Sequence, residues 1–202
     1  MTQASIIKKS VAITGIILIA ALFYWGTIVP YEKSRRLVSA LYATRSAGSA
    51  EELFAAINGS VRYRSPIGQE ETVRMIVNTL SSILGSLGEK NAPVIVPLFV
   101  RYINDISLPL VSRGKGFGYT RLIFSMGEFY QAAWMKTRTP AFAARAETYY
   151  RQCLALSSHR PECLRGLLLL YADGGKKEEA RVVASEIARF WPDDPSVTAI
   201  LR

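Results

Sequence analysis

The stretch that decides the fold runs from Pro161 to Pro195 and reads PECLRGLLLLYADGGKKEEARVVASEIARFWPDDP. Its first half begins with a proline, carries leucines at a helical spacing and stops at Gly174-Gly175. A second helical pattern runs from Lys177 to Phe190, and Pro192 ends it. The stretch therefore predicts a helical hairpin.

This hairpin is one copy of a repeat. Shifting the sequence by 34 residues lays Cys153–Pro161 over Ile187–Pro195 and brings Ala146 onto Ala180. A fixed period of this length indicates stacked units, because a single unit cannot bury its apolar face alone. We therefore expect an all-α fold, in which an α-solenoid of hairpins fills residues 119–202 and ends in a C-terminal capping helix.

The repeat resembles a tetratricopeptide repeat (TPR). In the clearer copy, six residues fall on characteristic positions of that family: Leu164, Leu167, Tyr171, Ala180, Ala184 and Pro192. Leu168 departs from the pattern, since the family prefers a small residue there. In the preceding copy, Gly127 to Arg160, the residues Tyr130, Ala133 and Ala146 fit, whereas Thr137, Tyr150 and Ser158 do not.

The resemblance also implies a binding surface, because the first helix of each TPR hairpin lines a concave groove. The groove positions of the family correspond here to Glu128, Gln131, Met135 and Arg138, and then to Glu162, Arg165, Leu169 and Ala172. This set lacks the Lys and Asn residues that clamp a peptide carboxylate in some chaperone-binding members. A protein partner is implied, but not that particular one.

The N-terminal part of the chain predicts a membrane anchor. A short basic segment, residues 1–10, precedes Val11–Val29, which reads VAITGIILIAALFYWGTIV and is uncharged over 19 residues. At ~1.5 Å per residue this helix is ~28 Å long, about the thickness of a bilayer core. A cleavable signal peptide is the alternative, but its apolar region is usually ~7–15 residues and ends in small residues, not in Leu22–Trp25. We expect a single-pass protein of the cytoplasmic membrane.

The sidedness of the anchor stays open. A short basic N-terminus ahead of a first apolar helix is typical of a signal anchor, which would export the repeats. Basic residues near the other end of the helix favour the opposite orientation. Those before the helix are Lys8 and Lys9, and those after it are Lys33, Arg35, Arg36 and Arg45.

Residues 30–112 predict degenerate hairpins of the same kind. Ser49 and Glu52 form a capping-box pattern that opens a helix. Further along, Ala92–Val111 is apolar but contains Pro97, Arg101 and Asp105, which argue against a second span. We expect this segment to be the most buried helix of the array.

The segment 113–118 breaks the helical pattern, with glycines at 114, 116 and 118 beside Arg113 and Lys115. Alternating glycines can cradle an anion through backbone N–H groups. Neither the spacing of a P-loop nor that of a dinucleotide fingerprint is present, however. We expect a hinge between the two halves of the array, and anion binding by Gly114–Gly118 stays open.

The chemistry of the chain argues against an enzyme. His159 is the only histidine, and no Cys-x-x-Cys is present, so a His-based triad and a common zinc site both lack parts. We expect no catalysis, no metal and no cofactor. Cys153 and Cys163 flank a predicted turn, where they either form a disulfide, which would place the domain outside the cytoplasm, or pack as buried thiols.

Charge leaves several partners open. The chain has 25 Lys and Arg against 16 Asp and Glu, a formal charge of +9, which suits anionic lipid or acidic glycan but also describes a merely basic surface. No basic cluster with interleaved aromatics appears, so we do not expect nucleic-acid binding.

A second resemblance covers Gly15–Val77. The segment Ile28–Ser34 behind the apolar run, followed by Glu51–Ser65 and Gly68–Arg74, resembles the region after the last span of bacterial O-antigen ligase or polymerase-like proteins. The many spans and the catalytic loop of that family are not found here. Two functions follow as expectations: a membrane-anchored TPR-like scaffold for protein–protein interaction, or an accessory part of a cell-envelope glycan machine.

Overall fold

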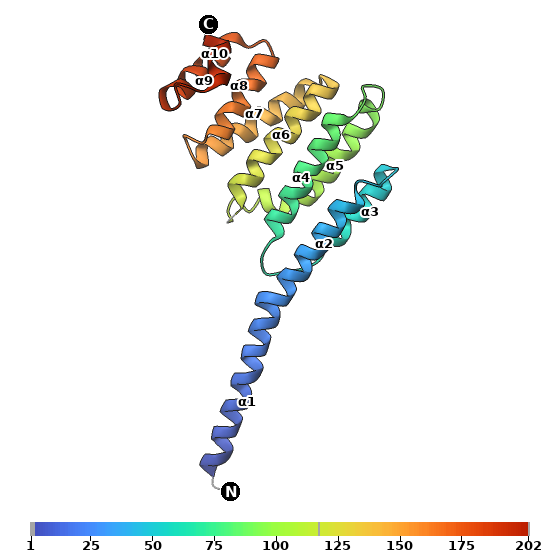
Figure 1. The fold of residues 1–202 in the computed structure, drawn as a ribbon, viewed down its shortest axis with the longest axis vertical. Helices are drawn as coiled ribbons and strands as arrows, with labels where there is room; N and C mark the ends of the chain where they lie inside the picture. The colour runs from blue at the N-terminus through green and yellow to red at the C-terminus, as the bar shows by residue number, and fades with distance from the viewer. Residues whose placement is uncertain (1–2, 117, 202) are drawn as a thin grey trace. The chain divides into compact units, whose positions relative to one another are not determined.

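The computed structural model describes residues 3–116 and 118–201, and these form helices joined by turns, with no strand among them (Figure 1). The all-α prediction is confirmed. The chain divides into two compact units, one that ends at Thr72 and one that begins at Val73. The boundary falls within α4 (Gln69–Ser86).

The first unit begins with one continuous helical stretch. It consists of α1 (Gln3–Phe23), a single π-helical segment η1 (Tyr24–Ile28) and α2 (Val29–Ala43). Pro30 has no N–H group, and its ring conflicts with the carbonyl one turn earlier in a regular α-helix. In the wider turn that precedes it, the N–H of Val29 donates to the carbonyl of Tyr24. The helix therefore passes the proline without ending.

The apolar side chains of this stretch are uncovered. Ile16, Ile19 and Leu22 are each more than 60% exposed. By length and composition, two helices among the described residues are apolar enough to cross a membrane, namely Ser10–Ala43 and Ala92–Val111. The first contains the predicted anchor.

A helical hairpin follows, formed by α2 and α3 (Ala50–Val61), which pack against each other. The hydroxyl of Ser49 accepts a hydrogen bond from the N–H of Glu52 at 3.2 Å, as the capping box predicts. The carboxylate of Glu52 accepts instead from the N–H of Gly48, at 2.8 Å, one residue before the expected donor. The first interaction satisfies an amide that the helix start leaves unpaired, and the second ties the residue before the cap to the first turn.

The second unit contains the rest of α4 and then α5 (Ala92–Val111), which is amphipathic and not the most buried helix. Six of its 20 residues are buried, against 11 of the 19 residues of α6 (Tyr119–Thr137). Val94 and Leu108 are 67% and 65% exposed. The prediction was wrong because apolar residues occur on both faces of α5, and one of these faces stays exposed.

The remaining helices form two successive hairpins and a terminal helix. They are α6 with α7 (Pro140–Leu156), α8 (Pro161–Asp173) with α9 (Lys177–Phe190), and α10 (Pro195–Leu201). Each packs against the next along the chain, and α6 also contacts α8. The helices α6 and α7 run antiparallel, since Gln152 near the end of α7 donates to the hydroxyl of Tyr119 at the start of α6, at 2.8 Å.

Tyr150, one of the residues that depart from the predicted repeat pattern, is accommodated by two glycines. Its ring lies against two glycines, Gly127 in α6 and Gly166 in α8. A Cβ atom at these positions would lie 2.6 and 2.5 Å from the ring, closer than real Cβ contacts allow. The hydroxyl of Tyr150 donates to Oε1 of Gln131 at 2.7 Å. Two absent side chains thus make room for an aromatic ring where the family has a small residue.

The predicted hinge, 113–118, lies inside the second unit rather than at the unit boundary. Gly114 and Gly116 have φ values of 69° and 145°, which only glycine adopts readily. Phe117, within this segment, lies outside the described residues. Across the turn, the hydroxyl of Tyr119 donates to the carbonyl of Val111 at 3.4 Å.

Candidate partner-binding surfaces

Several residues of the predicted TPR groove take part in interactions within the protein. Gln131 is 9% exposed and receives the hydrogen bond from Tyr150, so it supports the core. Arg138 ends α6 in a left-handed conformation, with φ of 54°, and its guanidinium lies 5.2 Å from the centre of the Trp134 ring. Gln131 is therefore a core residue and not a contact for a partner, whereas Arg138 is exposed beside Trp134.

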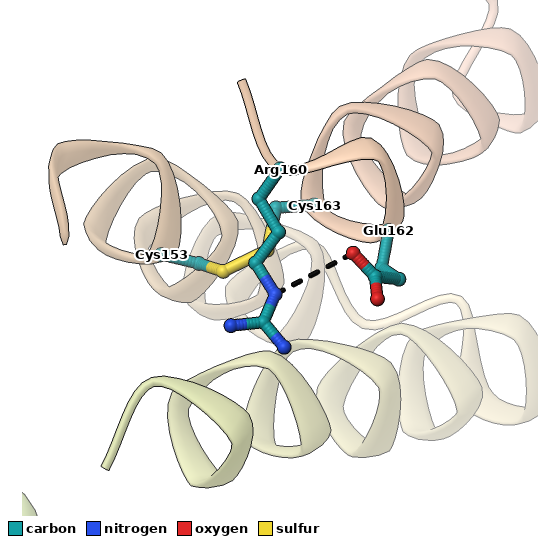
Figure 2. The surroundings of a disulfide bond; sticks show 4 residues. All are labelled: Cys153, Arg160, Glu162 and Cys163. Atoms are coloured by element: carbon teal, nitrogen blue, oxygen red, sulfur yellow. Dashed lines mark ion pairs between the residues drawn. A yellow bond between two sulfur atoms is a disulfide. The ribbon is translucent and has the colours of Figure 1, made fainter. Parts of the chain in front are cut away.

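Arg165 and Glu162 are also paired. The Nε of Arg165 donates to Oδ2 of Asp194 at 2.8 Å, and the side chain of Asp194 is only 2% exposed. Arg165 thereby holds the segment after α9 against α8. Glu162 forms an ion pair with Nε of Arg160 at 3.4 Å, beside the disulfide (Figure 2).

Four further groove residues, Glu128, Met135, Leu169 and Ala172, are exposed. Met135 and Leu169 occupy equivalent places in the two hairpins and are 48% and 50% exposed. Glu128 is exposed at its tip, yet surrounding protein desolvates it enough to raise the pKa of its carboxyl group. This face therefore offers an apolar pair and one carboxylate.

Cys153 and Cys163 form a disulfide that joins the end of α7 to the start of α8 (Figure 2). Their Cα atoms are 6.2 Å apart, and both residues are fully buried. They pack with Tyr119 and Ile123 of α6 in a small core cluster. The bond therefore connects two consecutive hairpins rather than the two helices of one hairpin.

A different surface, which we call the α7–α9 hollow, lies among three helices. It has a volume of about 350 Å³, and its walls come from α7, α8 and α9. Its apolar lining is Leu154, Leu164, Leu167, Val182 and Val183.

The rims of the hollow carry opposite charges. Arg151 stands on the α7 side, and Glu179 and Glu186 stand on the α9 side. Neither carboxylate is paired within the part of the chain that the structure describes. Val182, between them in sequence, is 69% exposed. The hollow thus combines a largely buried apolar lining, in which Val182 is the exposed residue and Leu154 is half-buried, with two free negative charges, in a chain whose formal charge is +9.

A hydrogen-bond network supports the Arg151 rim. Glu147 accepts from the hydroxyl of Tyr171 at 2.8 Å and from Nε of Arg151 at 2.9 Å, and Lys176 lies 3.4 Å from its other oxygen. Burial raises the pKa of the Glu147 carboxyl, but the hydrogen bonds from Tyr171 and Arg151 more than offset this and hold its pKa below the ordinary value. The network fixes α7 to α8 and to the turn before α9.

Sequence reasoning missed the hollow because α7 and α9 are brought together only by tertiary packing. The available signal was Val182, an apolar residue on the polar side of α9, with Glu179 and Glu186 three and four residues away. On a helix this spacing places all three on one face.

Chemical sites are sparse. Among the described residues, no group of three or more His, Cys, Asp or Glu side chains is placed to hold a metal ion. His159 lies in the turn between α7 and α8, with Nδ1 3.0 Å from the hydroxyl of Ser158 and its ring 4.3 Å from that of Phe190.

Comparisons of the chain with family models, with curated proteins and with solved structures found no match. Function is therefore inferred from the surfaces described above.

Proposed function

We propose that the chain is a non-catalytic scaffold, anchored in a membrane by Val11–Val29, whose TPR-like solenoid of helical hairpins binds a protein partner at the membrane surface. The observation that carries this proposal is the α7–α9 hollow, with its apolar lining and its unpaired carboxylates. The uncovered apolar face of α1, continuous with the first hairpin, supports the anchor.

The chemistry of the hollow suits a basic amphipathic helix as the partner. An amphipathic helix binds a groove through apolar residues spaced three or four apart. Glu179 and Glu186 are seven residues apart on α9, ~10.5 Å along the helix axis. The partner segment would therefore carry apolar side chains for the lining and two Lys or Arg residues about two turns apart for the carboxylates.

The disulfide supports an extracytoplasmic location for the hairpins. Disulfides persist in oxidising compartments and are rare in the cytosol. The anchor would then be a signal anchor, with the short segment 1–10 on the cytoplasmic side.

The scaffold is tested with the full chain, recovered from cells in mild detergent together with the proteins bound to it. A photo-crosslinking residue at Val182 should capture a partner, and the charge-reversing variant Glu179→Lys/Glu186→Lys should lose that partner. A control variant at exposed residues that do not line the hollow, Met135→Glu/Leu169→Glu, should retain it. Loss only in the Met135/Leu169 variant would transfer the contact to the predicted groove, and loss in neither would refute binding at both surfaces.

A second function fits the same compartment. If the disulfide-bonded hairpins lie outside the cytoplasm, the chain can serve as an accessory subunit of a cell-envelope glycan ligase or polymerase, which the resemblance of Gly15–Val77 implies. Recovery of a multi-span membrane enzyme with the wild-type chain would support this role. Recovery of unrelated proteins alone would exclude it.

A further inference from the structure

The hairpin formed by α2 and α3 contains a buried lysine, Lys33. Lys33 is 2% exposed. Its Nζ donates to the carbonyl of Tyr63 at 2.7 Å, to Oε1 of Gln69 at 2.6 Å and to the carbonyl of Ser60 at 3.5 Å. Ser60 lies in the last turn of α3, where helix carbonyls are otherwise unpaired and carry partial negative charge, and Tyr63 lies two residues beyond the helix. Lys33 therefore fastens the segment that follows α3 to α2.

The contacts of Lys33 set the distance, along the helix axis, between the proposed anchor and the segment that follows α3. Because the helix is continuous from α1 into α2, Lys33 lies four residues, ~6 Å, beyond Val29. The polar head-group layer extends ~5–8 Å beyond the hydrocarbon core on each side. The segment between α3 and α4, residues 62–68, is thus held at the level of the lipid head groups.

The segment is built for such a position. Arg62 and Arg64 are exposed and have no partner within the described residues, and Ile67 is 62% exposed. On α2, the guanidinium of Arg36 lies 4.6 Å from the centre of the Tyr63 ring. Exposed arginines around an exposed isoleucine combine the two features that favour a membrane interface.

Acidic groups at this end only partly balance the arginines. Glu32 pairs with Arg35 at 2.8 Å and with Arg36 at 2.9 Å, and Glu70 and Glu71 lie in the first turn of α4. The single Glu32 leaves guanidinium N–H groups of both arginines available. Arg35 and Arg36 also line a hollow of about 370 Å³ between α2 and α3, whose walls include the small residues Ser39 and Gly59.

We propose that Arg35, Arg36, Arg62 and Arg64 form a binding surface for the phosphate groups of anionic phospholipids, with Ile67 inserted at the interface. Arginine recognises phosphate through paired N–H groups. This inference rests on the proposed membrane anchor. It adds that the α2–α3 hairpin stands directly on the lipid surface.

The test uses the full chain in detergent, titrated with dioleoyl-phosphatidylglycerol or dioleoyl-phosphatidylcholine, with bound lipids counted by native mass spectrometry. Wild-type protein should retain phosphatidylglycerol preferentially. The variant Arg35→Gln/Arg62→Gln/Arg64→Gln should bind it at least tenfold more weakly, since each basic side chain near an anionic surface contributes about fivefold. The control Arg45→Gln/Lys90→Gln/Arg121→Gln removes the same charge from exposed sites elsewhere and should bind like the wild type.

Three results would overturn the proposal: equal retention of the two lipids by wild-type protein, equal weakening in both variants, or displacement of phosphatidylglycerol by ~10 mM inorganic phosphate, which would identify a free-phosphate site. Retention of the disulfide and of helical circular dichroism shows that each variant is folded. Alkaline carbonate washing of membranes separates this inference from the proposed function. A chain released by carbonate refutes the anchor, whereas a chain that stays but shows no lipid preference refutes only the lipid surface.

Discussion

The packing of the Tyr150 ring against Gly127 and Gly166, which we call the Tyr150 socket, gives a specific prediction about how the second unit is stabilised. Replacing Gly166 by alanine places a methyl group 2.5 Å from the Tyr150 ring, about 1 Å inside normal contact distance. The ring cannot move away freely, because it also contacts Gly127. In addition, the hydroxyl of Tyr150 donates a hydrogen bond to Gln131. Overpacking of this kind costs about 1–3 kcal/mol.

An opposing effect must be subtracted. Alanine stabilises a helix interior by about 0.5–1 kcal/mol relative to glycine. The net loss for Gly166→Ala should therefore be about 0.5–2 kcal/mol. Gly85 in α4 serves as a control, because a Cβ there meets nothing within 4 Å. Gly85→Ala should raise the free energy of unfolding by up to about 1 kcal/mol.

The assay is urea unfolding of the full chain in a non-ionic detergent, followed by circular dichroism at a helix wavelength. The decisive comparison is a double-mutant cycle with Tyr150→Ala. This variant is itself destabilised by about 3–5 kcal/mol, since it leaves a cavity. In its background, Gly166→Ala should be neutral or stabilising because the clashing ring is absent. Equal effects of Gly166→Ala with and without the ring would refute the socket.

Four further predictions concern the disulfide, the Arg165–Asp194 contact and the Glu147 network. The double variant Cys153→Ser/Cys163→Ser should lower the free energy of unfolding by about 2–3 kcal/mol, as expected for a closed loop of this length, and urea unfolding with and without reductant measures it. Because both cysteines are buried, maleimide should label the native chain only after unfolding and reduction, and labelling of the folded oxidised chain would contradict the disulfide. The variant Arg165→Met should cost about 1–3 kcal/mol because it removes a charged partner from the buried carboxylate of Asp194, and Asp194→Asn in the same background should recover part of the loss. The pKa of Glu147 is lowered in the folded state, so its contribution to stability is present above the unfolded pKa of about 4.3 and is lost as the pH falls through the folded value. Between pH 5 and pH 3, wild-type protein should therefore lose more stability than Glu147→Gln. Urea titrations of both proteins at several pH values measure this, and an equal fall in the free energy of unfolding of the two proteins would exclude the effect.

Local features of the chain were predictable because neighbouring residues decide them. The hairpin over Pro161–Phe190 follows from leucine spacing, the Gly174-Gly175 stop and the prolines at its ends, and the structure places α8 and α9 within a residue or two of these signals. Ser49 caps its helix as expected, since the bond that it accepts comes from only three residues away. The π-helical turn before Pro30 was not predicted, although proline was the available signal.

Roles that depend on distant residues were not predictable. The groove assignment placed Gln131 and Arg165 on the surface by register alone, but their partners, Tyr150 and Asp194, come from other helices and turns. In the sequence, Lys33 is one of several basic residues after the predicted anchor. In the structure, its ammonium group donates hydrogen bonds to carbonyls 27 and 30 residues further along the chain.

The sequence by itself determined that this chain is helical, where most helices begin and end, and that an uncharged segment of 19 residues precedes the hairpins. These properties depend on side-chain periodicity and on interactions within one turn of helix. The tertiary structure alone decided that Tyr150 fits between two glycines, that α7 and α9 enclose an apolar hollow, and that Lys33 holds the segment after α3 beside α2. Each of these depends on which surfaces meet, and that is set by the summed packing of several helices.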